Sequence, residues 1–267
     1  MDNSIIKHLQ QKEKEMLFEV INLFDKAGVR YFVACGTCLG TIRHKSFIPW
    51  DDDVDIYIFG TDYEKAKSLF LKHEMLEWHD NETHLGYPFT FPKIIAKGTI
   101  LIENGKNDIE YQEGVYIDVF PLVETPKSSI CLFLNEKIRY LRYAIVRLIY
   151  TDFKSKPRKT LRSIAKKMFD PQKVQKKTFD SYKKERNGSK ILIDSGVFGK
   201  HARLTKEDFS DNAYFPFEDF LVSVPKNYEH YLTSYYGDFM KLPPIEKQVS
   251  NHNCNYLMID GKEIIKK

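Results

Sequence analysis

Four aspartates fall within five positions of this chain, at residues 51, 52, 53 and 55. Like charges at this spacing repel strongly, so the segment needs either full solvation or a cation. The following residues, 54–59 (VDIYIF), alternate apolar side chains with Asp55 and Tyr57. Because alternate side chains of a strand share a face, we predict a strand with one buried apolar face. Its other face would carry Asp53 and Asp55 side by side.

Two carboxylates at i and i+2 on a rigid strand suit Mg²⁺, which prefers carboxylates together with substrate phosphates. We therefore predict Asp53 and Asp55 as ligands of Mg²⁺, with Mn²⁺ as an alternative ion. Asp51, Asp52 and Trp50 precede the strand and are expected just outside the ligand shell.

Three other interpretations of this region stay open. The run could be a solvated acidic turn. It could be an EF-hand loop, although Ile56 stands where that loop requires Gly and Asp62 where it requires Glu. The preceding C-x-x-C of Cys35 and Cys38 could indicate a redox or zinc protein, although this motif does not explain the aspartates.

The residues before the aspartates predict a phosphate-binding turn. Residues 29–34 read as a buried strand, Gly36 and Thr37 as a small-residue turn, and residues 37–43 as a short helix. A helix N-terminus with exposed amides binds phosphate readily. Strand, turn, helix and then a strand bearing Asp-x-Asp is the layout of the nucleotidyltransferase superfamily.

The long form of this motif resembles the LicD family of bacterial phosphocholine transferases, which are related to the fukutin proteins. The matching residues are Gly36, Thr37, Leu39, Gly40, Arg43, His44 and residues 48–55, IPWDDDVD. Two further blocks are similar, Gly114 to Leu122 and Phe215 to Pro244. Asp219 departs from the pattern, because a Gly is expected there. Within this family the nucleotide-linked donor and the acceptor both vary.

Asp118 is a lone acid in the strongly apolar segment 114–120. An unpaired buried carboxylate is costly. One interpretation is that a neighbouring Arg or Lys neutralises it. The other, which the family resemblance favours, makes Asp118 a third metal carboxylate that faces Asp53 and Asp55.

The pattern along the chain predicts an α/β (α+β) fold with a mixed sheet. We expect a nucleotidyltransferase-like catalytic core over 1–127, a basic helical insertion over 128–190 and a loop-rich C-terminal segment over 191–267. The expected helices are 4–27, 62–73, 128–150 and 158–186. The expected strands, besides those above, are 89–95, 99–103, 114–120 and 191–198.

The formal net charge of +4 hides an asymmetry. Residues 137–190 hold 18 Lys or Arg against four acidic residues, a net +14, which leaves −10 for the rest of the chain. Such a block indicates an anionic partner or a solvated helical face. The four cysteines and the absence of an apolar leader fit a cytoplasmic protein, and residues 130–150 carry too many charges to span a bilayer.

The resemblance implies a transferase that moves phosphocholine, or a related phospho-alcohol, from a CDP-linked donor such as CDP-choline. The acceptor would be a hydroxyl of a cell-surface glycan precursor on a lipid carrier, of teichoic acid, lipopolysaccharide or capsule. Asp118 would complete the metal site or accept the proton of that hydroxyl, and Gly36 and Thr37 would bind the phosphates. Arg43 and His44 would steady the leaving nucleotide phosphate, unless Arg43 pairs with a neighbouring aspartate.

A quaternary ammonium donor would require an aromatic cage, for which Trp50, Tyr57 and the C-terminal tyrosines are candidates. The basic insertion predicts a peripheral position on an anionic membrane, at the inner face of the plasma membrane. Two alternatives remain: a nucleotidyltransferase acting on RNA or a small molecule, and a non-catalytic adaptor that docks on membranes. Nucleic acid is the less expected partner.

Overall fold

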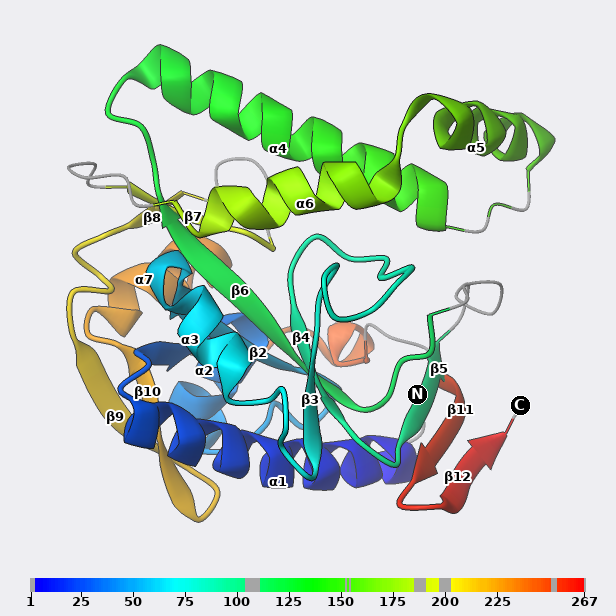
Figure 1. The fold of residues 1–267 in the computed structure, drawn as a ribbon. Coiled ribbons are helices and arrows are strands. Elements are labelled where there is room, and N and C mark those ends of the chain that lie inside the picture. The colour runs from blue at the N-terminus through cyan, green and yellow to red at the C-terminus, as the bar shows by residue number, and fades with distance from the viewer. Residues whose placement is uncertain are drawn as a thin grey trace.

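The computed structural model describes residues 3–103, 111–151, 153, 155–184, 191–196, 203–250 and 254–266. Its centre is a mixed sheet with the strand order β1-β2-β6-β4-β3, extended beside β6 by β7 and then β8 (Figure 1). The bounds of these strands are β1 Tyr31–Val33, β2 Val54–Phe59, β3 Leu76–His79, β4 Lys93–Ala96, β6 Tyr116–Glu124, β7 Ile191–Asp194 and β8 Arg203–Thr205. The predicted α/β fold is confirmed.

The central strands β2 and β6 are parallel neighbours, and nearly all of their residues are buried. The long helix α1 (Asn3–Ala27) confirms the first predicted helix. Its apolar stripe, which includes Leu17, Val20 and Phe24, is fully buried in the core. In Figure 1 this helix runs along one end of the sheet, and α4, α5 and α6 lie at the opposite end.

The predicted basic helical insertion is present as α4 (Ser129–Tyr150), α5 (Lys156–Met168) and α6 (Pro171–Tyr182). The prediction of one helix over 158–186 is wrong, because the helix is interrupted between α5 and α6. Residues 185 and 186 of the predicted helix lie outside the described part of the chain. Asp170 caps α6 by accepting the N–H groups of Gln172 and Lys173 at 3.0 and 3.2 Å. An N-cap Asp followed by Pro171 starts a new helix. The proposed domain boundaries stay a prediction.

The described part of the C-terminal segment contains short regular elements joined by loops. It forms a hairpin of β9 (Asn212–Phe217) and β10 (Phe220–Pro225), the helix α7 (Tyr228–Tyr236), the short turn η3 (Ile245–Lys247), and a second hairpin of β11 (Cys254–Ile259) and β12 (Lys262–Lys266). Side-chain packing overrides weak local signals here, since the inward residues of β9 and β10 join the core. Asp219, the departure from the family pattern, lies in the β9–β10 turn and pairs with Lys14 at 2.7 Å.

Several predicted boundaries shift. The helix predicted over 62–73 is shorter, with η1 (Gly60–Asp62) followed by α3 (Tyr63–Ser68). Strand β5 (Ile100–Glu103) pairs with β11 in a separate sheet, and the four-residue strand β3 was not predicted. The predicted strand 191–198 is seen as β7, and residues 197 and 198 lie outside the described residues.

Candidate active site

Strands β2 and β6 bring two predicted carboxylates together. In the parallel register Asp55 stands directly opposite Asp118, and both are buried. Side chains at paired positions share one face of a sheet. The flanking Val54 and Ile56 are fully buried, as the alternation of the sequence predicts.

The chain just before β2 holds the other three aspartates. One carboxylate oxygen from each of Asp51, Asp52 and Asp53 lies within 4.8 Å of the other two. Ser250 donates to Asp52 at 2.6 Å. A Cβ on Gly36 would lie 2.5 Å from Oδ2 of Asp51, so the absence of a side chain at this position lets the Asp51 carboxylate lie against the helix. The helix that follows β1 is therefore packed directly on the acidic segment.

The electrostatics of this site are those of crowded like charges. Burial, followed by the charges of Asp53 and Asp118, raises the pKa of Asp55 well above its usual range. Glu13 of α1 is also buried, and burial together with the neighbouring aspartates raises its pKa strongly. Within the described residues, Oε2 of Glu13 has no hydrogen-bond partner. A buried set of repelling oxygen donors fits a hard divalent cation.

Sequence reasoning missed Glu13, although a signal was present. It lies four residues before Leu17 and seven before Val20, on the apolar stripe of α1. An acid at such a position is either costly or functional.

Lys93 of β4 supplies the opposite charge. Its ammonium lies 2.7 Å from Oδ1 of Asp118 and 2.9 Å from Oε1 of Glu113, and its side chain is almost fully buried. Burial alone would lower the pKa of Lys93, but the Asp118 and Glu113 carboxylates outweigh it and raise the pKa. Neutralisation of Asp118 by a basic neighbour is therefore what the structure shows, and its role as a metal ligand stays a prediction.

Helix α2 (Cys35–His44) begins one residue earlier than the predicted turn, so Gly36 and Thr37 lie in its first turn. Thr37 accepts the backbone N–H of Asp55 on its hydroxyl at 2.9 Å. The first N–H of the helix, from Cys35, donates to the Tyr231 hydroxyl at 2.9 Å. The Thr37 contact ties the helix N-terminus to the acidic strand, and the Cys35 contact ties it to α7. Phosphate binding at this helix N-terminus stays a prediction.

Arg43 and His44 lie together at the far end of α2. Arg43 donates through Nε to His44 Nε2 at 2.9 Å and through Nη1 to the Phe239 carbonyl at 3.0 Å. The ring of Trp50 meets that of His44 edge-on, with centroids 6.5 Å apart. Burial lowers the pKa of Arg43, and the charges of Tyr236 and Asp51 oppose this effect. The structure therefore gathers these side chains near Asp51.

A further buried acid, Asp194 of β7, was not predicted. It accepts the hydroxyls of Tyr57 and Tyr235 at 2.6 and 3.0 Å. Burial raises its pKa, and its charge contributes to the raised pKa of Asp55. The sequence contained a signal for Asp194, because it is the one acid in the apolar run ILID, just as Asp118 is a lone acid in an apolar segment.

Two of the three rival interpretations, the EF-hand loop and the reactive C-x-x-C pair, do not fit the structure. Residues 54–59 form β2 rather than part of an EF-hand loop. Cys35 and Cys38 are free thiols, and burial raises the pKa of both, which is the opposite of an activated dithiol.

A mixed α/β domain with facing carboxylates on adjacent parallel strands, beside a helix N-terminus, has the layout that the sequence predicted for a nucleotidyltransferase-like core. Residues 28–137 match the family model described as LicD/FKTN/FKRP, nucleotidyltransferase domain. The resemblance to the LicD family that the sequence predicted is therefore found again in this stretch, which contains β1, α2, β2 and all of β6.

Named relatives extend this similarity. The chain is 28% identical over 271 residues to the lipopolysaccharide cholinephosphotransferase LicD of Haemophilus influenzae, with 92% of this chain and 97% of the relative covered. Human ribitol 5-phosphate transferase FKRP is 42% identical over 50 residues, 19% of this chain and 10% of the relative. Human ribitol-5-phosphate transferase FKTN is 38% identical over 79 residues, 27% of this chain and 17% of the relative. The named members of the family are transferases.

Proposed function

We propose that this chain transfers phosphocholine, or a related phospho-alcohol, from a CDP-linked donor to a hydroxyl of a cell-surface glycan precursor. The observation that carries this proposal is the acidic face of β2 and β6. There, Asp55 faces Asp118 within the stretch that matches the LicD-family model, and burial, followed by repulsion from Asp53 and Asp118, raises the pKa of Asp55. Similarity to the Haemophilus enzyme along nearly the whole chain favours lipopolysaccharide as the acceptor class and phosphocholine as the group.

Mg²⁺, or Mn²⁺, would be held by Asp53 and Asp55, with Asp118 at its other side. The donor set fits this ion because it consists of carboxylate oxygens. In addition, the buried Oε2 of Glu13 has no hydrogen-bond partner among the described residues. When bound, the ion would neutralise the diphosphate of the donor. Phosphoryl transfer needs positioning and charge neutralisation more than covalent chemistry.

The protein's own residues would supply the remaining parts. Lys93 keeps its proton and offers a fixed positive charge next to Asp118, which suits a transferring phosphoryl group. Asp118 can accept the proton of the attacking hydroxyl through the oxygen that does not face Lys93. Arg43 has guanidinium N–H groups besides those bound to His44 and the Phe239 carbonyl, and these can steady the leaving nucleotide phosphate.

The structure narrows the candidates for a choline cage. Tyr57 is fully buried, and its hydroxyl is bound to Asp194, so its ring is not available as an open wall. Tyr236 is 41% exposed, and desolvation of its hydroxyl raises its pKa, with smaller contributions from nearby charges that include Asp55 and Asp51. We therefore propose Tyr236 and the half-exposed Trp50 as the aromatic groups that face a quaternary ammonium.

The test is incubation of the full chain with CDP-choline, CDP-ribitol or CDP-glycerol, Mg²⁺ and a lipopolysaccharide acceptor, with CMP release as the readout. We expect Mg²⁺-dependent CMP release that is fastest with CDP-choline. Fastest turnover of CDP-ribitol would move the chain to the branch of the ribitol-phosphate transferases. Pyrophosphate release from CTP, without CMP release from any of these donors, would instead support a nucleotidyltransferase.

The outer helices α4 and α5 favour a membrane surface as a partner. Large apolar side chains stand exposed on them rather than packed on the core: Ile130, Phe133, Leu134, Ile138, Leu141, Leu161, Ile164 and Met168. The exposed basic residues of α5 include Arg158, Lys159 and Lys166. Both helices lie on the outside of the molecule (Figure 1). No helix in the described part of the chain is long and apolar enough to cross a bilayer.

An amphipathic basic helix binds anionic lipid through both its charge and its apolar side chains. We expect co-sedimentation with vesicles that contain anionic lipid, weakened by salt. Binding should fall when Arg158, Lys159, Arg162, Lys166 and Lys167 are changed to Glu. A matched control reverses five lysines elsewhere: Lys26, Lys72, Lys241, Lys247 and Lys262. Equal loss of binding in both variants would show that binding depends only on the net charge of the protein. If the wild-type protein does not bind anionic vesicles at low salt, the proposal of a membrane partner is wrong.

A further inference from the structure

The active-site face of the sheet extends beyond Lys93 to the strand at its edge. Asp55 pairs with Asp118, Asp118 with Lys93, and Lys93 of β4 with His79 of β3. Paired positions share a face, so the four side chains form one row across β2, β6, β4 and β3. His79 is therefore on the same face as the carboxylates, three strands away from Asp55.

A cluster of nitrogen and oxygen donors stands at the end of this row. One ligand atom from each of Glu77, His79 and His84 lies within 4.8 Å of the other two. The two imidazole rings are stacked, with centroids 3.4 Å apart and planes 20° apart, and His79 Nε2 lies 3.3 Å from Oε2 of Glu77. We propose that Glu77, His79 and His84 form a second metal site, which binds a transition-metal ion such as Zn²⁺. Two histidines and one glutamate are a known ligand set for this ion.

The outer contacts hold both rings through Nδ1. Nδ1 of His79 is hydrogen-bonded to the Tyr111 hydroxyl at 2.8 Å, and Nδ1 of His84 to the Thr83 hydroxyl at 3.1 Å. Metal-bound histidines regularly use their second ring nitrogen in this way, which fixes the ring and the tautomer. Nε2 of His79 donates to the Glu77 carboxylate in the metal-free protein, so a bound ion would take the place of that proton between the two groups.

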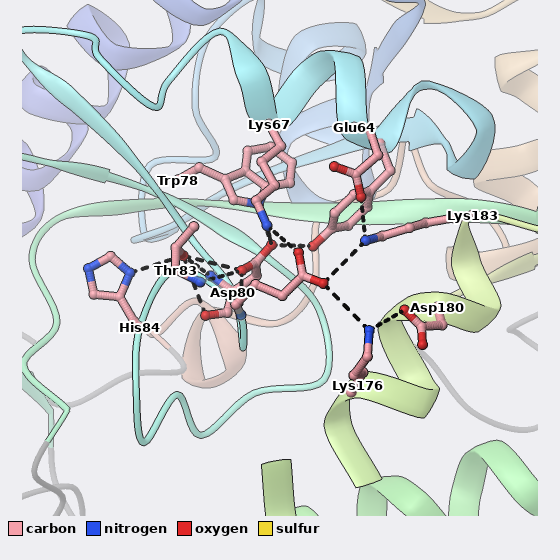
Figure 2. Close-up of polar contacts among 11 residues, drawn as sticks. Glu64, Lys67, Trp78, Asp80, Thr83, His84, Lys176, Asp180 and Lys183 are labelled. Carbon is pink, nitrogen blue, oxygen red and sulfur yellow. Dashed lines mark hydrogen bonds and ion pairs between the residues drawn. The ribbon is translucent and has the colours of Figure 1, made fainter. Parts of the chain in front are cut away.

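The support behind His84 is rigid. Thr83 is hydrogen-bonded to Asp80, whose side chain lies at the centre of the network in Figure 2. Asp80 in turn contacts Lys67 at 2.9 Å and the Trp78 ring nitrogen at 3.0 Å. Residues from α3, β3 and the following loop therefore hold this histidine in place.

Metal binding requires an adjustment of the geometry. Zn–N bonds are about 2.0–2.1 Å, so two ligand nitrogens on one ion lie at most about 4.2 Å apart. The ligand atoms lie within 4.8 Å of one another, so metal binding requires them to move closer and the stacked rings to turn until their nitrogens converge on the ion. The side chain of Glu77 is 46% exposed, which gives an ion access from solvent.

This site differs chemically from the aspartate cluster. Imidazole nitrogen favours Zn²⁺ and similar ions, whereas Mg²⁺ prefers oxygen. A bound ion would join β3 to the loop that carries His84, at the edge of the active-site face. The proposal does not depend on the proposed transferase activity.

The test is calorimetric titration of the metal-free full chain with Zn²⁺ in excess Mg²⁺, together with the shift of the melting temperature. We expect one Zn²⁺ per chain and a rise in melting temperature. His84→Gln and Glu77→Gln alter partly exposed side chains, and each should weaken binding by at least about 100-fold. The matched control is His73→Gln, because His73 also contacts a glutamate, Glu19 at 3.2 Å, but has no second histidine in its group.

The His73 variant should bind Zn²⁺ like the wild type. Unchanged Zn²⁺ affinity in His84→Gln, or the absence of Zn²⁺ binding to the folded wild-type protein, would overturn the proposal. Loss of binding in Asp53→Asn alone would assign the Zn²⁺ to the aspartate cluster and overturn it equally.

Discussion

Two buried carboxylate sites of this molecule show opposite chemistry. Asp80 accepts hydrogen bonds from Tyr63 at 2.8 Å and from Trp78, and pairs with Lys67 (Figure 2). Burial would raise its pKa, but the Lys67 contact and the hydrogen bonds outweigh it and lower the pKa. Asp55 is buried among other acids, and its pKa is raised. The protein itself supplies hydrogen-bond donors and a positive charge to Asp80, whereas Asp55 is surrounded by acids that repel its charge.

The comparison distinguishes structure from function. A carboxylate that the fold needs is surrounded by donors, as Asp80 is. A carboxylate that the fold would be more stable without persists only if something outside the chain uses it. Asp55 and Glu13 are of this second kind, which is why we propose that the acidic face binds a ligand.

The largest expected effect is on turnover. Asp55→Asn and Asp53→Asn should each reduce CMP release by about 10³-fold or more, because stabilisation by a bound ion is worth several kcal/mol. Their melting temperatures without metal should equal or exceed that of the wild type, since repulsion is relieved. Measured steady-state rates near those of the wild type, or unfolded variants, would remove these aspartates from the site.

At Asp80 we expect the opposite result, a loss of stability. Asp80→Ala should destabilise the fold by about 3 kcal/mol in urea unfolding, because it leaves Lys67 buried with only Glu82 as a partner. Asp180→Ala, a half-exposed position on α6, is the matched control and should change stability by less than about 0.5 kcal/mol. A tolerated loss of Asp80 would break the contrast between the two sites.

The two sites should also respond oppositely to pH. A group with a raised folded pKa holds its proton in the folded state after the unfolded chain has lost it. Stability of the metal-free protein should therefore fall as pH rises from the ordinary carboxyl pKa, about 4, through the raised pKa values of Asp55 and Glu13. Glu13→Gln should flatten this slope in urea titrations across that range.

The lowered pKa of Asp80 has the reverse sign. Its contribution is complete above the ordinary carboxyl pKa and is lost as pH falls through the lowered value. Asp80→Asn should therefore show a weaker loss of stability in acid than the wild type. A steeper loss in this variant would contradict the assignment of Asp80 as a stabilising acid.

The smallest effect concerns Thr37. Its hydroxyl accepts the N–H of Asp55, a single hydrogen bond worth about 1 kcal/mol. Thr37→Val should lower stability by about that amount in urea unfolding, and Thr37→Ser should restore most of it. A Val variant as stable as the wild type would show that this contact does not hold α2 on the acidic strand.

The sequence predicted those parts of the fold and site whose signals are local. Alternation over 54–59 predicted β2, and the stripe of Leu17, Val20 and Phe24 predicted α1. The mixed α/β fold followed from these patterns and from the family resemblance.

The missed parts depend on contacts between distant segments. Strand β3 is only four residues long and is recognisable by its pairing with β4, and β5 pairs with β11 from the far end of the chain. Lys93 gains its role only when β4 meets Asp118 on β6. In the same way, Glu13 becomes part of the site because α1 packs near the aspartates.

The most direct measurement of the central claim is calorimetric titration of Mg²⁺ into the protein saturated with CDP. The account predicts that wild-type protein and Asp180→Ala bind Mg²⁺ with the same affinity. It predicts that Asp55→Asn, with its fold intact, does not bind. Equal Mg²⁺ binding by the wild type and Asp55→Asn, or none by a folded wild type that holds CDP, would contradict the claim that these buried acids are kept for a cation.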